Sequence, residues 1–400
     1  MANITQLKHL EHLEDEMLNY GVEGCKAAVA FLKELRKMIG QANSSGFMQT
    51  KWDGAPSVVC GKHPYTKRFF VGTKSVFNKD NPKICFFDHD IDAWYGTQPV
   101  LRDKLKTCLT EFKKLDIDGI VQGDLLFTDD KKKEVINGET LITFKPNTIT
   151  YAIPADQPLG LAAAQANIGV VFHTHYVGED ISNLQATAGG KTSSSIPDVL
   201  TINNDTPMDK VNFSNSELNS FDNHVRTIEQ KCKQSGDFLD ELVKFSGSTG
   251  DAKWHVSSYI KQFFNSEIKA ARTIGDVGTT LENLTNFYHN KTKAAADKLT
   301  VKTQIKKKAL IYESENYLME NQAKFKAMIE LYKELQSLKQ MVIDKLDKLE
   351  NQIKTFVLTD KGYKITTHEG YVMHKDGDMI KFVNRIEFSY NNFTLAKQWR

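Results

Sequence analysis

The 400-residue chain is long enough for about two or three domains, and its 40% hydrophobic and 26% charged residues are typical of a globular protein with a sizeable core. Its 52 basic and 50 acidic residues leave a net charge of +2, which excludes a protein that is basic all over and restricts any nucleic-acid site to a local patch. Five scattered cysteines without C-x-x-C spacing argue against a disulfide framework or a zinc site. No apolar run reaches the ~18 residues of a membrane span. We therefore expect a cytoplasmic protein without a membrane partner.

From the N-terminus, residues 5–39 are predicted to form two helices, because apolar residues recur at steps of three and four. The break between the two helices is expected near Gly21 and the end of the second at Gly40, while the interleaved Glu and Lys residues are expected to form a solvated face. From about residue 46 to 178 the pattern changes to that of a β-rich region. Strands are predicted at 57–60, 68–72, 120–127, 141–144, 148–153 and 168–175, with a helix at 100–115.

Beyond residue 180 the predicted strands give way to helices. Residues 186–196 are expected to form a mobile loop, 215–300 several helices and 314–354 one long helix. Strands are then predicted again at 356–358, 363–366, 370–374, 379–383 and 386–390. We therefore expect an α+β protein in which a large α-helical insertion splits a β-rich core. The expected divisions are an N-terminal helical segment (1–45), the first part of the core (46–180), the insertion (181–355) and the last part of the core (356–400).

The sequence Lys51-Trp52-Asp53-Gly54 has a workable layout for a covalent lysine nucleophile. Residues i and i+2 of a strand face the same side, so Asp53 can lie beside Lys51, and Gly54 lets a backbone come close to a bound ligand. A free lysine titrates near ~10.4, so it needs desolvation or cationic neighbours to act as a nucleophile. The alternative is a strand entering a turn with a solvated Lys51, because so short a motif recurs by chance.

Four further segments of the β-rich parts would suit chemistry in which a nucleotide is attached to a lysine. Lys74 and Ser75 stand at the end of a predicted strand, where they suit contacts to phosphate. Asp124 lies at the mouth of an apolar strand, where a ribose hydroxyl could bind. Glu369 could hold a metal through its carboxylate, and Lys381 could neutralise a triphosphate.

These segments resemble the motifs of the covalent nucleotidyltransferases, which comprise ATP-dependent DNA ligases, RNA ligases and mRNA capping enzymes. Residues 51–54 resemble motif I, and the remaining motifs follow in the family's order: 123–125 (motif III), 170–172 (motif IIIa), 369–372 (motif IV) and 380–383 (motif V). Motif IV followed by Asp376-Gly377 is closest to the phage RNA ligases. The stretch 146–151 also resembles an uncharacterised family of tailed-phage proteins, which would place the chain in the host cytoplasm.

The resemblance implies an adenylyltransferase core of antiparallel sheets that uses ATP with Mg²⁺ or Mn²⁺. Lys51 would become a lysyl-AMP, AMP would pass to a 5′-phosphate end, and a 3′-hydroxyl would displace it, with RNA favoured over DNA as the nucleic-acid partner. The resemblance assigns the other residues as follows: Asp53 and Gly54 shape the nucleophile loop, Lys74 and Lys381 contact phosphates, Asp124 contacts the ribose, Phe172 stacks on the base and Glu369 binds the metal.

Three departures leave other functions open. Asp124 stands where the family carries glutamate, Val383 replaces the second lysine of motif V, and no OB-fold sequence follows that motif. The alternatives are a DNA ligase, a nucleotidyltransferase with another acceptor, or a phage structural or interaction protein with a degenerate core. The basic run Lys302–Lys308 is expected either to bind nucleic acid or to form a solvated helix face. His173 and His175 would bind a metal, or one of them would lie in the nucleotide pocket.

Overall fold

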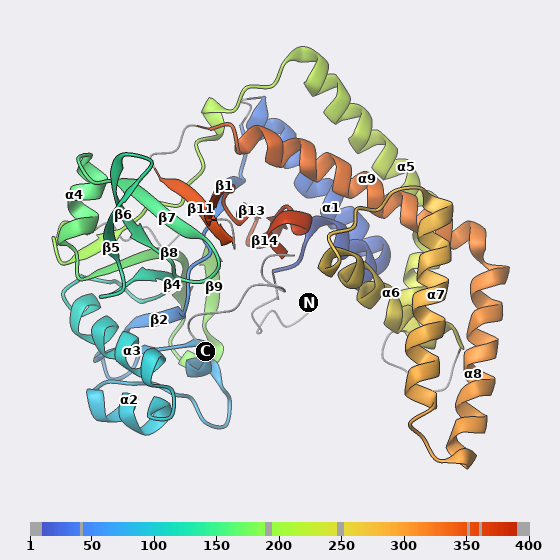
Figure 1. The fold of residues 1–400 in the computed structure, drawn as a ribbon, viewed down its shortest axis with the longest axis horizontal. Helices are drawn as coiled ribbons and strands as arrows, with labels where there is room; N and C mark the ends of the chain where they lie inside the picture. Colours follow the sequence, from blue (N-terminus) through green and yellow to red (C-terminus); the bar gives the residue numbers. More distant parts are fainter. Residues whose placement is uncertain are drawn as a thin grey trace.

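The computed structural model describes residues 10–40, 43–188, 194–245, 252–349, 353–359 and 362–389. Within these residues the protein is α+β, with sheets on one side and long helices on the other (Figure 1). No helix of the described part is both long enough and apolar enough to cross a membrane.

A small antiparallel sheet lies between the other sheets and the helices (Figure 1). It has the order β1-β13-β14 and contains β1 (Phe47–Lys51), β13 (Gly370–Lys375) and β14 (Asp378–Phe382). The register runs from Phe47 opposite His374 to Lys51 opposite Gly370. Segments more than 300 positions apart in the sequence therefore lie side by side, so the end of β1 meets the start of β13.

The largest sheet is antiparallel except for its parallel β10–β8 pair, and it has the order β10-β8-β4-β2-β3, with β9 also paired to β8. Its strands are β2 (Ser57–Lys62), β3 (Phe69–Gly72), β4 (Ile120–Phe127), β8 (Ile168–Val177), β9 (Gln185–Ala188) and β10 (Val199–Thr201). Helices α2 (Asp88–Tyr95) and α3 (Pro99–Phe112) cover one face, where apolar side chains of β2, β4 and β8 pack against Phe112 and Leu105. The strands predicted at 57–60 and 68–72 are confirmed as β2 and β3, which form an antiparallel pair.

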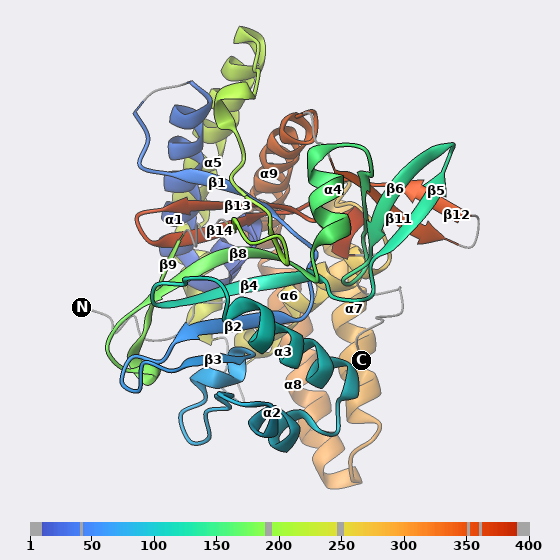
Figure 2. The ribbon, with the colours of Figure 1, turned by 90° about the vertical axis from the view of Figure 1, so that its left-hand side faces the viewer.

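The third sheet also joins distant parts of the chain. Its order is β12-β11-β7-β6-β5, and helix α4 (Pro158–Gln165) packs against β6 and β7. The strands are β5 (Lys132–Ile136), β6 (Glu139–Phe144), β7 (Thr150–Pro154), β11 (Lys354–Thr359) and β12 (Gly362–Ile365). Strand β7, which precedes the long helices, thus pairs with β11, which follows them, and Figure 2 shows β11 in the same region as β5 and β6.

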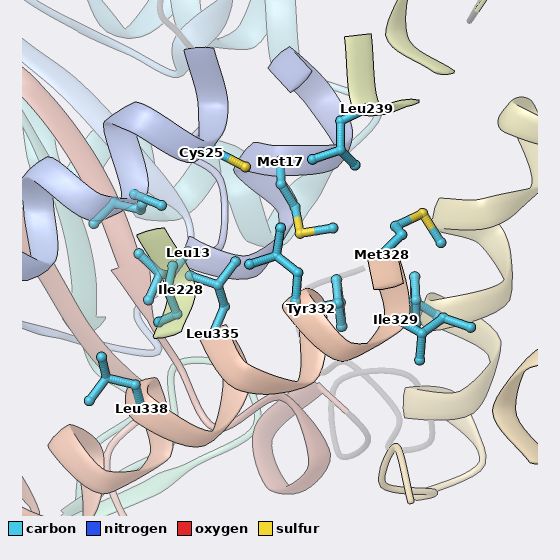
Figure 3. Packing of buried hydrophobic residues seen from close by; sticks show 14 of the residues in the cluster. Leu13, Met17, Cys25, Ile228, Leu239, Met328, Ile329, Tyr332, Leu335 and Leu338 are labelled. Carbon is cyan, nitrogen blue, oxygen red and sulfur yellow. The ribbon is translucent and has the colours of Figure 1, made fainter. Parts of the chain in front are cut away.

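Helix α1 (Glu16–Ile39) follows a short 3-10 turn at Leu13–Asp15 and packs mainly against α5, the first of the five long helices. They are α5 (Asn215–Phe245), α6 (Ala252–Lys269), α7 (Val277–Ala296), α8 (Val301–Glu320) and α9 (Gln322–Leu346). Figure 3 shows Leu13 and Met17 pointing toward Tyr332 and Leu335 of α9, and all four side chains are fully buried. The N-terminal helix therefore shares one apolar core with α5–α9.

Gly21 breaks the helix, as expected. Its φ of 58° and ψ of −129° lie outside the helical region, and a Cβ there would stand 2.2 Å from Oδ1 of Asp240. The same carboxylate accepts a hydrogen bond from the backbone N–H of Val22 at 2.8 Å. Glycine thus allows α5 to approach the kink, and Gly40 follows the last residue of α1.

Three expectations about the elements are wrong. The single helix expected at 314–354 is two helices, because Asn321 leaves the helical region and both its N–H and its side chain donate to the carbonyl of Tyr317. The strand expected at 386–390 is a π-helical turn at Arg385–Ser389, held by the bond from Phe388 N–H to the Asn384 carbonyl. Strand β9 overlaps the loop expected at 186–196, and β10 lies in a region where no strand was expected; residues 189–193 of the expected loop fall outside the described residues.

Candidate active site around Lys51

Lys51 and Glu369 form an ion pair at the junction of β1 and β13. Lys51 is the last residue of β1, and Glu369 immediately precedes Gly370, which is the partner of Lys51 in the β1–β13 register. The two side chains keep 23% and 12% of their surface exposed, so the pair is within reach of a ligand. Gly370 has a φ of 147°, and a Cβ there would stand 2.5 Å from the carbonyl oxygen of Phe382. Only glycine therefore fits directly beside Glu369.

The electrostatics of this pair favour a charged lysine. Burial alone would lower the pKa of Lys51, but the carboxylates of Glu369 and Asp124 outweigh it and raise that pKa above its ordinary value. Burial raises the pKa of Glu369 to about 7, although Lys51 and Lys381 act in the opposite direction. Lys51 is thus an ammonium in the free protein, and a hydrogen-bonded carboxylate of unusually high pKa stands beside it.

Asp124, on β4, is the second acid of the cluster. Its Oδ1 lies 3.5 Å from Nε2 of His173 on β8, and Nδ1 of that ring lies 2.8 Å from the hydroxyl of Thr174. Burial would raise the pKa of Asp124, but His173 and Lys51 together lower it. A Cβ at Gly54 would stand 2.5 Å from the Cβ of Asp124, so the glycine that ends the lysine motif lets β4 come this close.

Asp53 has a positioning role, because its carboxylate is already fully engaged. It accepts hydrogen bonds from Asn147 Nδ2 at 2.7 Å, from Thr148 N–H at 2.7 Å and from Ile149 N–H at 2.8 Å. Its own N–H donates to the hydroxyl of Tyr151 at 2.8 Å, and the residue is only 3% exposed. Burial raises the pKa of Asp53 despite these donors. The loop after Lys51 is thereby fixed to the start of β7.

Lys381 lies on β14 and is the second cation of the cluster. It is opposite Val372 of β13, and its backbone N–H donates to the carbonyl of Glu11 at 2.9 Å. Burial lowers the pKa of Lys381, and the charge of Lys51 lowers it further while Glu369 opposes this. Lys51, Asp124, Glu369 and Lys381 are therefore linked by electrostatic interactions that pass through Lys51.

Phe172 and Lys74 do not join this group. Phe172 is 4% exposed and packs edge-on against Phe112 of α3 at 5.5 Å, on the opposite face of β8 from His173. This packing gives no support to the prediction that Phe172 stacks on a nucleobase, and His173 is the ring on the face of Asp124. Lys74 begins the short 3-10 turn Lys74–Phe77 after β3, and its exposed side chain forms no hydrogen bond or ion pair with a described residue.

A network of buried ion pairs links the 3-10 turn at Leu13–Asp15 to α9 and to Arg385, and the sequence analysis did not predict it. Lys339 of α9 donates to both oxygens of Glu14 at 2.6 and 2.7 Å. Arg385 donates to Asp15 at 3.0 Å and to the hydroxyl of Tyr332 at 3.0 Å. The acids were expected on a solvated face, yet Glu14 is 0% and Asp15 2% exposed. Their cationic partners lie more than 300 positions away, so no local pattern in the sequence marks the network.

The described residues contain no group of three or more His, Cys, Asp or Glu side chains that could hold a metal ion, so a metal site at His173 and His175 gains no support. Mg²⁺ usually takes only one or two protein carboxylates and completes its shell with phosphates and water. The pair Asp124 and Glu369 has that composition.

Comparison with known proteins assigns the chain to a family without assigning it a function. No curated protein and no solved structure matches it. A family model matches residues 3–397, which covers the helices as well as the sheets. The chain therefore belongs to DUF6267, a family of unknown function.

Proposed function

We propose that this protein is a covalent nucleotidyltransferase that transfers AMP through Lys51 to the 5′-phosphate end of a polynucleotide. The observation that carries the proposal is the grouping of Lys51, Asp124, Glu369 and Lys381 around one sheet junction. These residues span 330 positions, and each belongs to a different motif of the resemblance. A lysine between carboxylates, with a second lysine on a neighbouring strand, has the components that a lysyl-nucleotide mechanism requires.

In the first step Nζ of Lys51 attacks the α-phosphorus of ATP. A P–N bond forms, the bond to the bridging oxygen breaks and pyrophosphate leaves. The ammonium must lose a proton before it attacks, and the hydrogen-bonded carboxylate of Glu369, whose pKa is raised to about 7, is the acceptor. Lys381 supplies positive charge to the departing phosphates, and a divalent metal that enters with the nucleotide would neutralise the remaining charge on them.

The later steps return the lysine to its starting state. An oxygen of a 5′-phosphate attacks the α-phosphorus, the P–N bond breaks and Lys51 regains its proton. A 3′-hydroxyl then attacks the activated 5′-phosphorus, and AMP leaves as the new phosphodiester forms. Asp124 would contact the ribose, while Asp53 and Gly54 hold the loop beside Lys51. The resemblance favours RNA over DNA as the substrate, so the acceptor is part of the test.

The test is incubation with α-labelled ATP and Mg²⁺, followed by denaturing electrophoresis. We expect label on the wild-type protein and none on Lys51→Ala or Lys51→Arg, because neither variant retains the amine in its place. The matched control is Lys62→Ala, which removes an exposed lysine of β2 paired with Asp116. Adding 5′-phosphorylated RNA or DNA to the labelled protein should discharge it, and the more effective acceptor identifies the substrate. Label that persists on Lys51→Ala would contradict the proposal.

The rival candidate is a phage structural or interaction protein whose core has lost this chemistry. It is favoured by one electrostatic observation, namely that neighbouring carboxylates raise the pKa of Lys51 rather than lower it. Asp124 and Val383 also agree with a loss of this chemistry, because the family resembled carries glutamate and lysine at these two positions. A wild-type protein that takes no label from ATP, GTP or NAD would favour this candidate.

A further inference from the structure

The hairpin of α7 and α8 carries an unusual concentration of positive charge. Residues 291–308, here called the α7–α8 tip, contain seven lysines and one acidic residue, Asp297. Their formal charge is +6, whereas the whole chain has a net charge of +2, so the rest of the chain is net acidic. The lysines are Lys291, Lys293, Lys298, Lys302, Lys306, Lys307 and Lys308.

The tip stands away from the sheets. It comprises the end of α7, the connection at 297–300 and the first two turns of α8. Figures 1 and 2 both place it at the far end of the hairpin, which projects from the remaining helices. The charge is therefore presented at an extremity of the molecule, where a long partner could approach it without meeting the sheets.

The ammonium groups of the tip have no acidic partner among the described residues. Six of the seven lysines are exposed, and Lys307 is half-buried with its Nζ 2.7 Å from Nε2 of His255. Lysines elsewhere on the helices do pair, as Lys231 does with Glu330 and Lys345 with Glu217, both at 2.7 Å. The potential of the tip is thus uncompensated, which favours a partner that carries regularly spaced negative charge.

Exposed apolar side chains accompany the lysines on α8. Val301, Ile305 and Tyr312 are 75%, 66% and 66% exposed, and their spacing of four and seven places them on one face of the helix. Lys308 lies on that same face, three residues after Ile305 and four before Tyr312. The charge of Lys308 interrupts the continuous apolar face that binding to a membrane would require. A nucleic acid instead offers phosphates to the lysines and bases to the apolar side chains.

We propose that the α7–α8 tip binds the phosphate backbone of a nucleic acid without reading its sequence. The lysines contact phosphates and release counterions, and Tyr312 offers a ring on which an unpaired base can stack. This surface is separate from the Lys51 cluster, so its binding does not depend on adenylation.

The experiment measures fluorescence anisotropy of a labelled single-stranded RNA, a single-stranded DNA and a duplex over a range of salt concentrations. The test variant is the triple Lys298→Glu, Lys302→Glu and Lys306→Glu. The control is the triple Lys113→Glu, Lys132→Glu and Lys133→Glu, which makes the same charge change at exposed lysines of the sheet region. A third protein with Gln at the three tip positions removes the charge without reversing it, and circular dichroism checks that all variants fold.

We expect the tip triple to lose at least about tenfold in affinity and to reduce the slope of log K against log salt by about two, since each phosphate contact contributes roughly 0.7 on a single strand. The control triple should keep the wild-type slope, and Lys51→Ala should bind as the wild type does. Equal slopes for the two triples would overturn the proposal. It would also be overturned by a wild-type protein that binds anionic lipid vesicles through the tip but binds no nucleic acid. Binding through the tip by a protein that cannot be adenylated would uphold this proposal and refute the proposed function.

Discussion

Lys51 and Glu369 are separated by 318 positions in the sequence and form an ion pair across the junction of β1 and β13. Each residue controls the protonation of the other. The carboxylate keeps the lysine charged, and burial beside the lysine leaves the carboxyl group with a pKa of about 7. The same contact therefore joins two distant segments, and it includes the proton that Lys51 must lose in the proposed reaction.

Replacing Glu369 with Gln should lower the pKa of Lys51, because it removes the opposite charge that contributes most to raising it. Competitive acetylation of Lys51 between pH 7 and 11, read by peptide mass spectrometry, measures the change. Glu139→Gln is the matched control, since it removes a carboxylate paired with Lys354 far from the site. An unchanged acetylation profile for Glu369→Gln would show that the ion pair does not set the charge of Lys51.

Replacing Asp53 with Ala should destabilise the protein by about 3 kcal/mol, because it leaves two buried backbone N–H groups and the amide of Asn147 without their acceptor. Asp53→Asn should cost less, since it retains one carbonyl oxygen. Urea unfolding followed by circular dichroism measures both, with Asp116→Ala at a 97% exposed side chain as the control. A loss below about 1 kcal/mol for Asp53→Ala would mean that the loop 147–149 is held by other contacts.

The buried pair of Glu14 and Lys339 should show strong coupling. Lys339→Met removes both hydrogen bonds to the buried carboxylate of Glu14, whose other cationic neighbour, Arg385, is 3.6 Å away, and should cost about 3–5 kcal/mol, whereas the double variant with Glu14→Leu should be more stable than that single variant. A double-mutant cycle measured by urea unfolding gives the coupling energy. Simple addition of the two single costs would contradict the view that the penalty arises from an unpaired buried charge.

His374 should make the protein sensitive to acid. The ring is 3% exposed and stacks on Phe47 at 4.4 Å, and both ring nitrogens lack a hydrogen-bond partner among the described residues. Burial lowers the pKa of His374 to about 4. The unfolded state therefore binds more protons between pH 4 and 6.5, so stability present above pH 6.5 is lost as the pH falls, by up to about 3 kcal/mol.

The variant His374→Phe keeps an aromatic ring and removes the titration. Its unfolding free energy, measured in urea from pH 7.5 to 4, should therefore fall less steeply than that of the wild type below pH 6.5. His89→Phe, at a side chain that is 78% exposed, should keep the wild-type dependence. Parallel curves for wild type and His374→Phe would mean that the ring is protonated in the folded protein.

Local patterns in the sequence determined most of the elements and four members of the candidate site. Apolar periodicity predicted β4 and α3, Gly21 predicted the break in the first helix, and the lysine motif marked the end of β1. These features depend on neighbouring residues alone, because the periods of strand and helix and the conformational freedom of glycine act over a few positions. The α+β class followed from the order of those elements.

Only the tertiary structure decided which way the side chains face and which charges meet. Val170, Val171 and Phe172 are all buried, so the apolar run could not reveal that Phe172 faces α3 while His173 faces Asp124. A register irregularity in β4 beside Gly123 also alters which residues of β4 and β8 stand opposite each other. The partners of Glu14 and Asp53 come from distant segments, and electrostatic and hydrogen-bond energies depend on distance in space, which the linear sequence does not contain.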